Sequence, residues 1–380
     1  MASNLRSIAI YLPQFHPIPE NDAWWGKGFT EWTNVAKAKP LFKGHYQPHL
    51  PADLGFYDLR LPEVRDQQAQ LAREYGIYGF CYYHYWFNGR RILERPFKEV
   101  FESGKPNFPF MLCWANENWT RVWDGGEKNI LLQQNYSEED DRNHIRTLIP
   151  YFKDSRYIKI EGKPVFAVYR STLLPNAHKT TDIWREEAQK EGLELYICRF
   201  ESHGYIGKNF IEEGGFDAAI DFQPFGNFFN DFRNKKIHAF ANPSLPNRVK
   251  NKINRLALKT FKEKEYRLLL EMQHKVWDYK EYVDYVTQQP LPEYKWFPGI
   301  APSWDNYARK KKNYFMFKNA SPQAYMKWLK HIVDSYKPKS LEENFIFINA
   351  WNEWAEGNHL EPCSKWGLQY LESTKEVLNS

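Results

Sequence analysis

The stretch F-I-F-I-N-A-W-N-E-W-A-E-G-N-H-L-E-P, residues 345–362, decides how the rest of the chain is interpreted. It begins with an apolar run, residues 345–350, of the kind that forms a buried strand. It then changes abruptly into Trp, Asn, Glu and His, and two carboxylates, Glu353 and Glu356, stand between indole rings. Packing gives no reason for so many polar groups beside a strand. The pattern therefore indicates a strand that ends at an active site.

Seven similar runs precede this one, and stretches with a helical period separate most of them. Parallel strands need long crossovers, usually helices, so the alternation predicts an α/β fold with a parallel sheet. Eight strands in 380 residues favour a (β/α)8 TIM barrel, with residues 1–380 as one catalytic domain. The predicted strands are residues 7–12, 79–83, 110–114, 165–169, 194–199, 218–222, 297–301 and 345–350. The predicted helices are residues 62–75, 96–103, 138–152, 181–191, 209–213, 322–336 and 368–378.

Polar and aromatic residues follow many of the predicted strands. In a barrel the loops at the carboxyl ends of the strands carry the chemistry. A doubly wound sheet would not need such residues after all its strands, and no Gly-rich phosphate motif follows the first strand. Residues predicted to bind substrate, each with a structural hydrogen bond as the alternative, are Gln14, His16, His84, Trp86, Asn116, Glu117, Trp119, Tyr169, Glu201, Asp305, Trp351, Asn352 and His359. Glu361 is predicted to be structural.

Two stretches are too long for simple connections. Residues 13–59, the long loop after the first strand, are predicted to cover the barrel mouth. Residues 228–292 are predicted to form a helical insertion after the sixth strand. Its basic residues favour a solvated face, with contact to an anionic glycan or a partner as the alternative. They are Arg248, Lys250, Lys252, Arg255, Lys259, Lys262 and Lys264.

The composition sets further bounds. A formal net charge of +5 neither requires nucleic acid, which we do not expect as a partner, nor excludes an anionic polysaccharide. The aromatic share of 17% exceeds what a core needs, and surplus rings often line sugar sites. The four cysteines are far apart without a C-x-x-C pair, so they are predicted to be reduced core thiols. No oligomeric state is predicted.

No apolar run approaches the roughly 18 residues that would span a bilayer, and no signal segment precedes the first predicted strand. The sequence as given therefore predicts a cytoplasmic protein. A periplasmic or secreted location is the alternative, if a leader was removed.

Glu353 and Glu356 match the chemistry of glycosidic hydrolysis, which usually needs one carboxyl group as acid and a second as base or nucleophile. A spacing of three residues separates them onto opposite faces of an extended strand, whereas a helical turn brings them to one side. Trp351 and Trp354 can exclude water and raise one carboxyl pKa, as an acid role requires. Surface or ion-paired carboxylates remain the alternative.

Three stretches together resemble the WbsX-type family, once described as glycosyltransferases: W-N-E-W-A-E-G-N-H-L-E-P from Trp351, Y-L-P-Q-F-H-P from Tyr11 and W-G-K-G-F-T-E-W from Trp25. The resemblance covers nearly the whole chain. That family is in turn similar to the glycoside hydrolase family 99 endo-α-mannosidases and endo-α-mannanases, whose barrels end in a related E-W-x-E motif. The similarity to these mannosidases is concentrated at the last strand.

The resemblance implies that Glu353 is the base for the 2-hydroxyl of the sugar, and Glu356 the general acid and later general base. In that family the 2-hydroxyl oxygen attacks the anomeric carbon and gives a 1,2-anhydro sugar, with retention. The attack needs O2 and the leaving group to be trans, as in α-mannosidic or α-L-rhamnosidic linkages of an oligo- or polysaccharide.

Two other function classes stay open. A nucleotide-sugar-dependent glycosyltransferase of surface-polysaccharide biosynthesis commonly holds the diphosphate through an Asp-x-Asp metal site or a Gly-rich, basic loop, and the sequence contains neither. A glycan-binding module without catalysis is the third class, and the paired glutamates argue against it. No H-E-x-x-H motif or Cys/His cluster is present, so neither a metal nor a cofactor is predicted.

Overall fold

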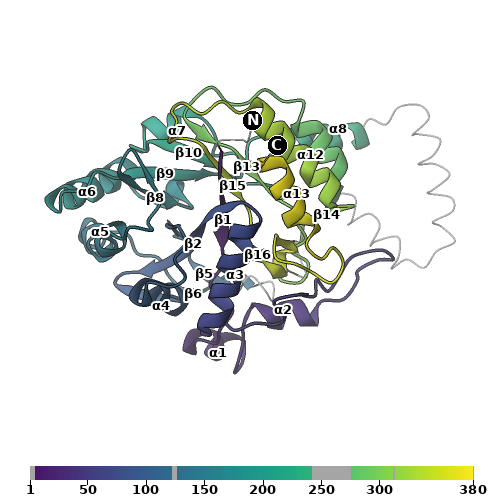
Figure 1. Cartoon of the computed structure of the whole chain (residues 1–380), viewed down its shortest axis with the longest axis horizontal. Helices are drawn as coiled ribbons and strands as arrows, with labels where there is room; N and C mark the ends of the chain where they lie inside the picture. Colours follow the sequence, from purple (N-terminus) through teal and green to yellow (C-terminus); the bar gives the residue numbers. More distant parts are fainter. Residues whose placement is uncertain (1–4, 122–125, 242–274, 311–312, 380) are drawn as a thin grey trace.

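The computed structural model describes residues 5–121, 126–241, 275–310 and 313–379, and a parallel sheet lies at its centre (Figure 1). From the first to the sixth, each strand of the barrel pairs in parallel with the next, and the last pairs in parallel with the first. The circle around the core is therefore almost complete with seven strands. In spatial order they are β1 Arg6–Tyr11, β2 Ile77–Phe87, β4 Phe110–Trp114, β8 Lys163–Val168, β9 Tyr196–Glu201, β10 Ala218–Asp221 and, beside β1, β15 Phe345–Ile348.

A split strand closes the barrel. β12 Trp296–Phe297 pairs with β10, and β13 Gly299–Ile300 pairs with β15. Only Pro298 lies between them, and a proline has no N–H to donate to a neighbouring strand. A side chain at Gly299 would place its Cβ 1.9 Å from the backbone oxygen of Asp221, so only glycine allows the strands to approach. The two short strands together form the seventh barrel strand, and the predicted (β/α)8 TIM barrel is confirmed.

Helices follow the barrel strands and pack outside them (Figure 1). The predicted helix at residues 181–191 begins four residues earlier, because the Asn176 side chain caps it by accepting a hydrogen bond from the Lys179 N–H at 3.0 Å. The helices are α3 Pro62–Glu74, α4 Arg95–Ser103, α5 Glu138–Phe152, α6 Ala177–Lys190, α7 Lys208–Glu212, α11 Tyr279–Val286, α12 Pro322–Ser335 and α13 Gln369–Leu378.

Strand β2 is longer than predicted. It continues to Phe87 because β3 Arg90–Ile92 folds back against it in antiparallel pairing. Asn88 and Gly89 form the connection, both with positive φ, as a tight hairpin turn requires. Alternate residues of an extended strand point to opposite faces, so the extra length decides which β2 side chains reach the barrel mouth.

The long loop, residues 13–59, contains α1 Pro19–Trp25 and α2 Glu31–Lys37. It lies against the end of the last barrel strand, where the rings of Trp32 and Trp354 are 5.4 Å apart.

The described part of residues 228–292 contains α8 Phe229–Ala241, the barrel helix α11 and β11 Val276–Asp278. β11 pairs with β14 Met316–Lys318, and neither strand was predicted. The seven basic residues singled out in the sequence lie outside the described residues. The division into one domain with these two added segments stays a prediction.

Shorter elements complete the fold: β5 Trp119–Arg121, β6 Gly126–Leu132, β7 Lys159–Ile160, β16 Asn352–Glu353, β17 Asn358–His359, and the 3-10 helices η2 Ser171–Leu173 and η3 Trp354–Glu356. The four cysteines are buried and unpaired, which confirms the prediction of reduced core thiols. Among the described residues, no helix combines the length and apolar character needed to cross a membrane.

Candidate active site

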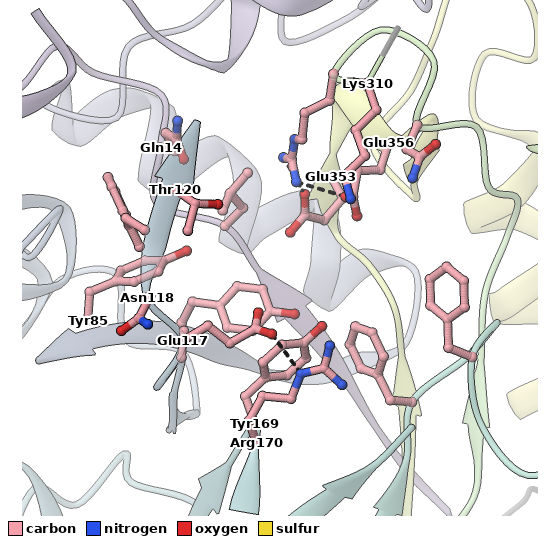
Figure 2. Close-up of a pocket in the computed structure, with 18 of the residues that line it drawn as sticks. Gln14, Tyr85, Glu117, Asn118, Thr120, Tyr169, Arg170, Lys310, Glu353 and Glu356 are labelled. Atoms are coloured by element: carbon pink, nitrogen blue, oxygen red, sulfur yellow. Dashed lines mark hydrogen bonds and ion pairs between the residues drawn. The ribbon is translucent and has the colours of Figure 1, made fainter. Parts of the chain in front are cut away.

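A cavity of about 550 Å³ opens at the carboxyl ends of the barrel strands (Figure 2). Every barrel strand contributes to its wall, either with a residue of its own or through the loop that follows it. This is the position at which (β/α)8 barrels carry their chemistry. Wall residues in chain order include Leu12, Tyr85, Glu117, Arg170, His203, Phe222, Trp304, Arg309, Glu353 and Glu356.

Glu353 and Glu356 lie on one side of this cavity (Figure 2). Strand β15 ends at Ile348, and the chain then makes a short hairpin of β16 and β17 with the 3-10 helix η3 at its tip. Glu353 caps the start of η3 and Glu356 is its last residue, so a single 3-10 turn of about three residues separates the two side chains. The helical alternative of the sequence analysis is thus the one that the chain adopts.

Arg309 joins the two carboxylates. Its Nη1 donates to Glu356 Oε1 at 2.9 Å, and its Nη2 donates to Glu353 Oε2 at 3.0 Å. The same Nη2 donates to Glu31 Oε1 at 2.6 Å. Glu31 comes from α2 of the long loop, is fully buried, and also accepts from the Ala355 N–H at 3.1 Å. One guanidinium therefore bridges three carboxyl groups.

Burial raises the pKa of both cavity carboxyl groups, because an ionised carboxylate loses its water there. The pKa of Glu353 rises to about 8; the negative charges of Glu356 and Glu31 add to burial, and Arg309 opposes it. Burial disfavours the charged guanidinium of Arg309, but the three carboxylates outweigh this and hold its pKa well above the ordinary value. The carboxyl pair thus retains a proton to higher pH than free glutamates would.

The opposite wall carries a second ion pair (Figure 2). Arg170 Nε donates to Glu117 Oε1 at 2.7 Å, and Arg170 Nη1 donates to Ser202 Oγ at 2.9 Å. Aromatic rings also line the cavity, and apolar ring faces of this kind pack against the C–H faces of sugars. These aromatic wall residues are Trp25, Tyr83, Tyr85, Trp119, Tyr169, Phe222, Phe225 and Trp304.

A buried acceptor, Glu361, stands behind the hairpin of β16 and β17. Its Oε2 accepts from Trp354 Nε1 at 2.6 Å and from the Tyr57 hydroxyl at 2.8 Å, and its Oε1 accepts from Gln68 Nε2 at 2.6 Å. Burial raises the pKa of Glu361 to about 7. The carboxyl group links the hairpin, the long loop and α3, as its predicted structural role requires.

Six of the predicted site residues line the cavity: Gln14, Glu117, Trp119, Tyr169, Glu353 and Glu356. Their contact with a substrate stays a prediction.

His84 and Trp86 point away from the cavity, on the other face of β2. His84 stacks on His144 of α5, with 3.1 Å between their Nε2 atoms. Trp86 Nε1 donates to both carboxylate oxygens of Asp140 at 3.0 Å. Strand β2 extends beyond its predicted end at residue 83, and Tyr83 and Tyr85, not His84 and Trp86, are the β2 residues that reach the cavity.

Other predicted residues fix the strand ends instead of lining the wall. Asn116 Oδ1 accepts from the Arg170 N–H at 2.8 Å. Asn352 Oδ1 accepts from the Leu12 N–H at 2.7 Å. Glu201 accepts from the Gly207 N–H and the Tyr294 hydroxyl, both at 2.8 Å.

His16 and Trp351 are almost completely buried. His16 Nδ1 is 3.2 Å from the Pro13 oxygen, and Trp351 packs 5.1 Å from the ring of Phe80. The last two predicted residues, Asp305 and His359, line a second cavity instead of the mouth.

Sequence reasoning missed Glu31 and Arg309. Glu31 stands in T-E-W, which repeats the Glu-Trp pair of Glu353 and Trp354, and this repetition was the available signal. Arg309 carried no signal beyond its place in the loop after the seventh strand. In the part of the chain that the structure describes, no three His, Cys, Asp or Glu side chains gather as ligands for a metal ion; a metal-free site stays a prediction.

The fold and the cavity define a (β/α)8 barrel of the kind found in glycoside hydrolases. The endo-α-mannosidase of glycoside hydrolase family 99 from Bacteroides thetaiotaomicron has a similar structure, with a TM-score of 0.57 and 13% identity over 100% of this chain and 97% of that one. Its complex with bis-tris propane gives 0.55 and 14% with the same coverage. A glycoside hydrolase-like protein gives 0.57 and 13%, over 100% of this chain and 95% of that one.

The chain belongs to the family described as Glycosyltransferase WbsX, whose model matches residues 7–374. Two uncharacterized proteins WxcX of Xanthomonas campestris pv. campestris, from strains B100 and ATCC 33913, are each 40% identical to it over 373 residues. These residues are 98% of this chain and 49% of each relative. The chain thus spans about half the length of the curated relatives that it matches.

Proposed function

We propose that this chain is a retaining glycoside hydrolase that cleaves 1,2-trans α-mannosidic or α-L-rhamnosidic linkages in a polysaccharide. The observation that carries the proposal is the placement of Glu353 and Glu356 on one side of the barrel-mouth cavity, bridged by Arg309. Glycosidic cleavage needs such a pair, with one carboxyl group protonated and the other ionised.

In the first step, ionised Glu353 takes the proton of the sugar's 2-hydroxyl group. The O2 atom then attacks C1 from the face opposite the leaving group, and the C1–O bond to the leaving sugar breaks. Protonated Glu356 gives its proton to the departing oxygen. The products are a 1,2-anhydro sugar and a shortened chain, and the proton has in effect moved from one carboxyl group to the other.

In the second step, ionised Glu356 takes a proton from water, and the water oxygen attacks C1. The C1–O2 bond opens, and O2 recovers a proton from Glu353. Two inversions at C1 give net retention, and both carboxyl groups return to their initial states. Only the singly protonated pair begins this cycle. The raised pKa values of both groups keep one proton on the pair toward neutral pH, and the mechanism needs that proton on Glu356.

A glycosyltransferase is the second candidate, favoured by the description of the family to which the chain belongs. It would use the same cavity to pass a sugar from a donor to an acceptor hydroxyl group. Transfer needs an activated donor, whereas hydrolysis needs only water, so the two candidates differ in a simple requirement.

The test is incubation of the protein with rhamnans and mannans of known linkage, without any nucleotide sugar, with mass-spectrometric detection of the products. We expect new reducing ends, and a loss of about 10²–10⁴-fold in rate for Glu353→Gln and for Glu356→Gln. Glu372→Gln is the control, because Glu372 is an exposed residue of α13 outside both cavities, and its rate should equal that of the parent. Turnover only with a nucleotide sugar, or a Glu353→Gln variant as fast as the parent, would refute the proposal.

A further inference from the structure

A second cavity, of about 330 Å³, lies behind the wall that carries Glu356. The segment of residues 303–305 separates it from the mouth, and Trp304 contributes to both cavities. This partition is tied to the hairpin of β16 and β17, because the Asp305 N–H donates to the Glu356 backbone oxygen at 2.6 Å, and Ser303 Oγ donates to the Gly357 oxygen. The second cavity is therefore next to the candidate active site but separate from it.

The ionised groups of this cavity are mostly cationic. Three lysines line it, each from a different segment: Lys43 from the long loop, Lys318 from β14 and Lys365 from the stretch before α13. Within the described ranges, none of the three has a carboxylate within 4.0 Å, whereas Lys153, Lys163 and Lys208, for example, are paired.

The carboxylate that lines the cavity already has partners. Asp305 Oδ2 is 2.6 Å from His45 Nε2 and accepts from Gln47 Nε2 at 2.8 Å, while Oδ1 accepts from the Tyr307 N–H at 3.0 Å. The Asp305 carboxylate thus holds the long loop in place. It does not neutralise the ammonium groups of the three lysines. A cavity with this charge favours an anion.

Aromatic rings supply the rest of the lining. The ammonium of Lys365 lies 4.6 Å from the ring centre of Tyr46 and 4.7 Å from that of Trp366, so the two rings orient one of the cations. Phe42 stacks on His45, with 4.9 Å between ring centres and an angle of 13°. Ring faces beside cations are the combination that holds a sugar and its acidic substituent together.

We infer that the second cavity binds an acidic sugar residue, whose carboxylate or phosphate pairs with Lys43, Lys318 and Lys365 while its ring packs against the aromatic lining. In a polysaccharide substrate, such a residue would hold the chain beside the cleavage site. The inference rests on the proposed function only for the view that the ligand is part of a saccharide.

The test is calorimetric titration of the whole protein with D-glucuronate, D-glucose 6-phosphate, D-glucose and inorganic phosphate, at low and at moderate salt. We expect one or both acidic sugars to bind more tightly than D-glucose and inorganic phosphate, with affinity that falls as salt rises. Preference for glucuronate identifies a carboxylate ligand, and preference for the sugar phosphate identifies a phosphate ligand.

The variant Lys43→Gln/Lys318→Gln/Lys365→Gln should bind the preferred acidic sugar at least tenfold more weakly. The matched control is Lys105→Gln/Lys179→Gln/Lys337→Gln, which removes the same charge from exposed lysines that line neither cavity. Glu353→Gln should bind as the parent does, which places the ligand outside the mouth.

Equal weakening in both triple variants, or loss of binding in Glu353→Gln, would overturn the second site. Affinity for D-glucose or inorganic phosphate equal to that for the acidic sugars would also overturn it. These measurements need no turnover, so a failure of the proposed hydrolysis would leave their outcome unchanged.

Discussion

Arg309 forms ion pairs with all three carboxyl groups of the candidate site, so the charge of each group affects the pKa of the others. Three carboxyl groups surround one guanidinium, so full ionisation would leave excess negative charge in a buried place. Retaining a proton on the group lowers this electrostatic cost. The charge balance of these four side chains therefore favours a proton on the carboxyl pair toward neutral pH.

Glu31→Gln should extend activity to lower pH. The base Glu353 must be ionised, so activity is lost as pH falls through its raised pKa, and the negative charge of Glu31 is one cause of that rise. Removing this charge should move the acidic limb of kcat/KM down by about one pH unit. The measurement is the pH profile, with Glu117→Gln as the control. An acidic limb that stays in place would show that Glu31 does not act on Glu353.

Arg309→Gln should destabilise the fold more at pH 8 than at pH 5. Without the guanidinium, the folded-state pKa values of Glu353 and Glu356 rise further above their unfolded values. When the pKa of an acid is higher in the folded than in the unfolded protein, the free energy of unfolding is greatest below the unfolded-state pKa. It decreases as pH rises toward the folded-state pKa. We expect a loss of about 3–5 kcal/mol at pH 8 and a smaller loss at pH 5.

Denaturant unfolding at the two pH values measures this difference. Arg142→Gln is the control, because its partner Glu187 has a pKa lowered to about 2 by hydrogen bonds from Lys190 and Arg146. That partner stays ionised across the range, so the loss should not change with pH. An equal loss at both pH values for Arg309→Gln would contradict the charge argument.

At the scale of elements, the two faces of strand β2 have different surroundings. Tyr83 and Tyr85 face the cavity, and His84 and Trp86 face α5. The alternation is a consequence of the extended backbone, and the Asn88-Gly89 hairpin keeps the backbone extended beyond the barrel rim.

Tyr85→Phe should therefore affect activity, whereas Trp86→Phe should affect stability. Tyr85→Phe removes a hydroxyl group from the cavity wall, and we expect kcat/KM to fall about three- to tenfold with little change in stability. Trp86→Phe leaves the Asp140 carboxylate without its indole donor, which should cost about 1–3 kcal/mol of stability and leave kcat/KM near that of the parent. Steady-state kinetics and denaturant unfolding of both variants check this, and the reverse pattern would contradict the assignment of faces.

At the scale of the whole molecule, Glu361 connects distant parts of the chain to the hairpin of β16 and β17. Its three donors belong to the long loop, α3 and η3. Trp32 of α2 also packs on Trp354, so the long loop and the last strand support each other. The position of Glu353 and Glu356 thus depends on segments from both ends of the chain.

Glu361→Gln replaces one acceptor oxygen by an NH2 group, which faces a donor. We expect a loss of about 2–3 kcal/mol in stability and a lower kcat, because the hairpin loses its anchor. Thermal unfolding and kinetics measure the two effects. The control Glu372→Gln changes an exposed residue of α13 and should alter neither quantity. Unchanged stability in Glu361→Gln would show that the network does not hold the hairpin.

The sequence by itself determined the barrel and the carboxylate pair. Apolar runs and helical periods are properties of neighbouring residues, so they predicted the strands and their order with errors of a few residues. The seventh strand shows the limit of this reasoning, since a single apolar run became two short strands that divide their pairing between β10 and β15. Motif resemblance added the family.

Only the tertiary structure decided which groups meet. Glu31 and Arg309 are 278 residues apart in sequence and 2.6 Å apart in space, and no local pattern records such a contact. The β2–β3 hairpin extends β2, and so places Tyr85 at the cavity. One turn of 3-10 helix brings Glu353 and Glu356 to the same side of the cavity. The second cavity exists only where four separate segments converge. Local periodicity sets the elements, whereas charge pairing and packing between distant loops set the site.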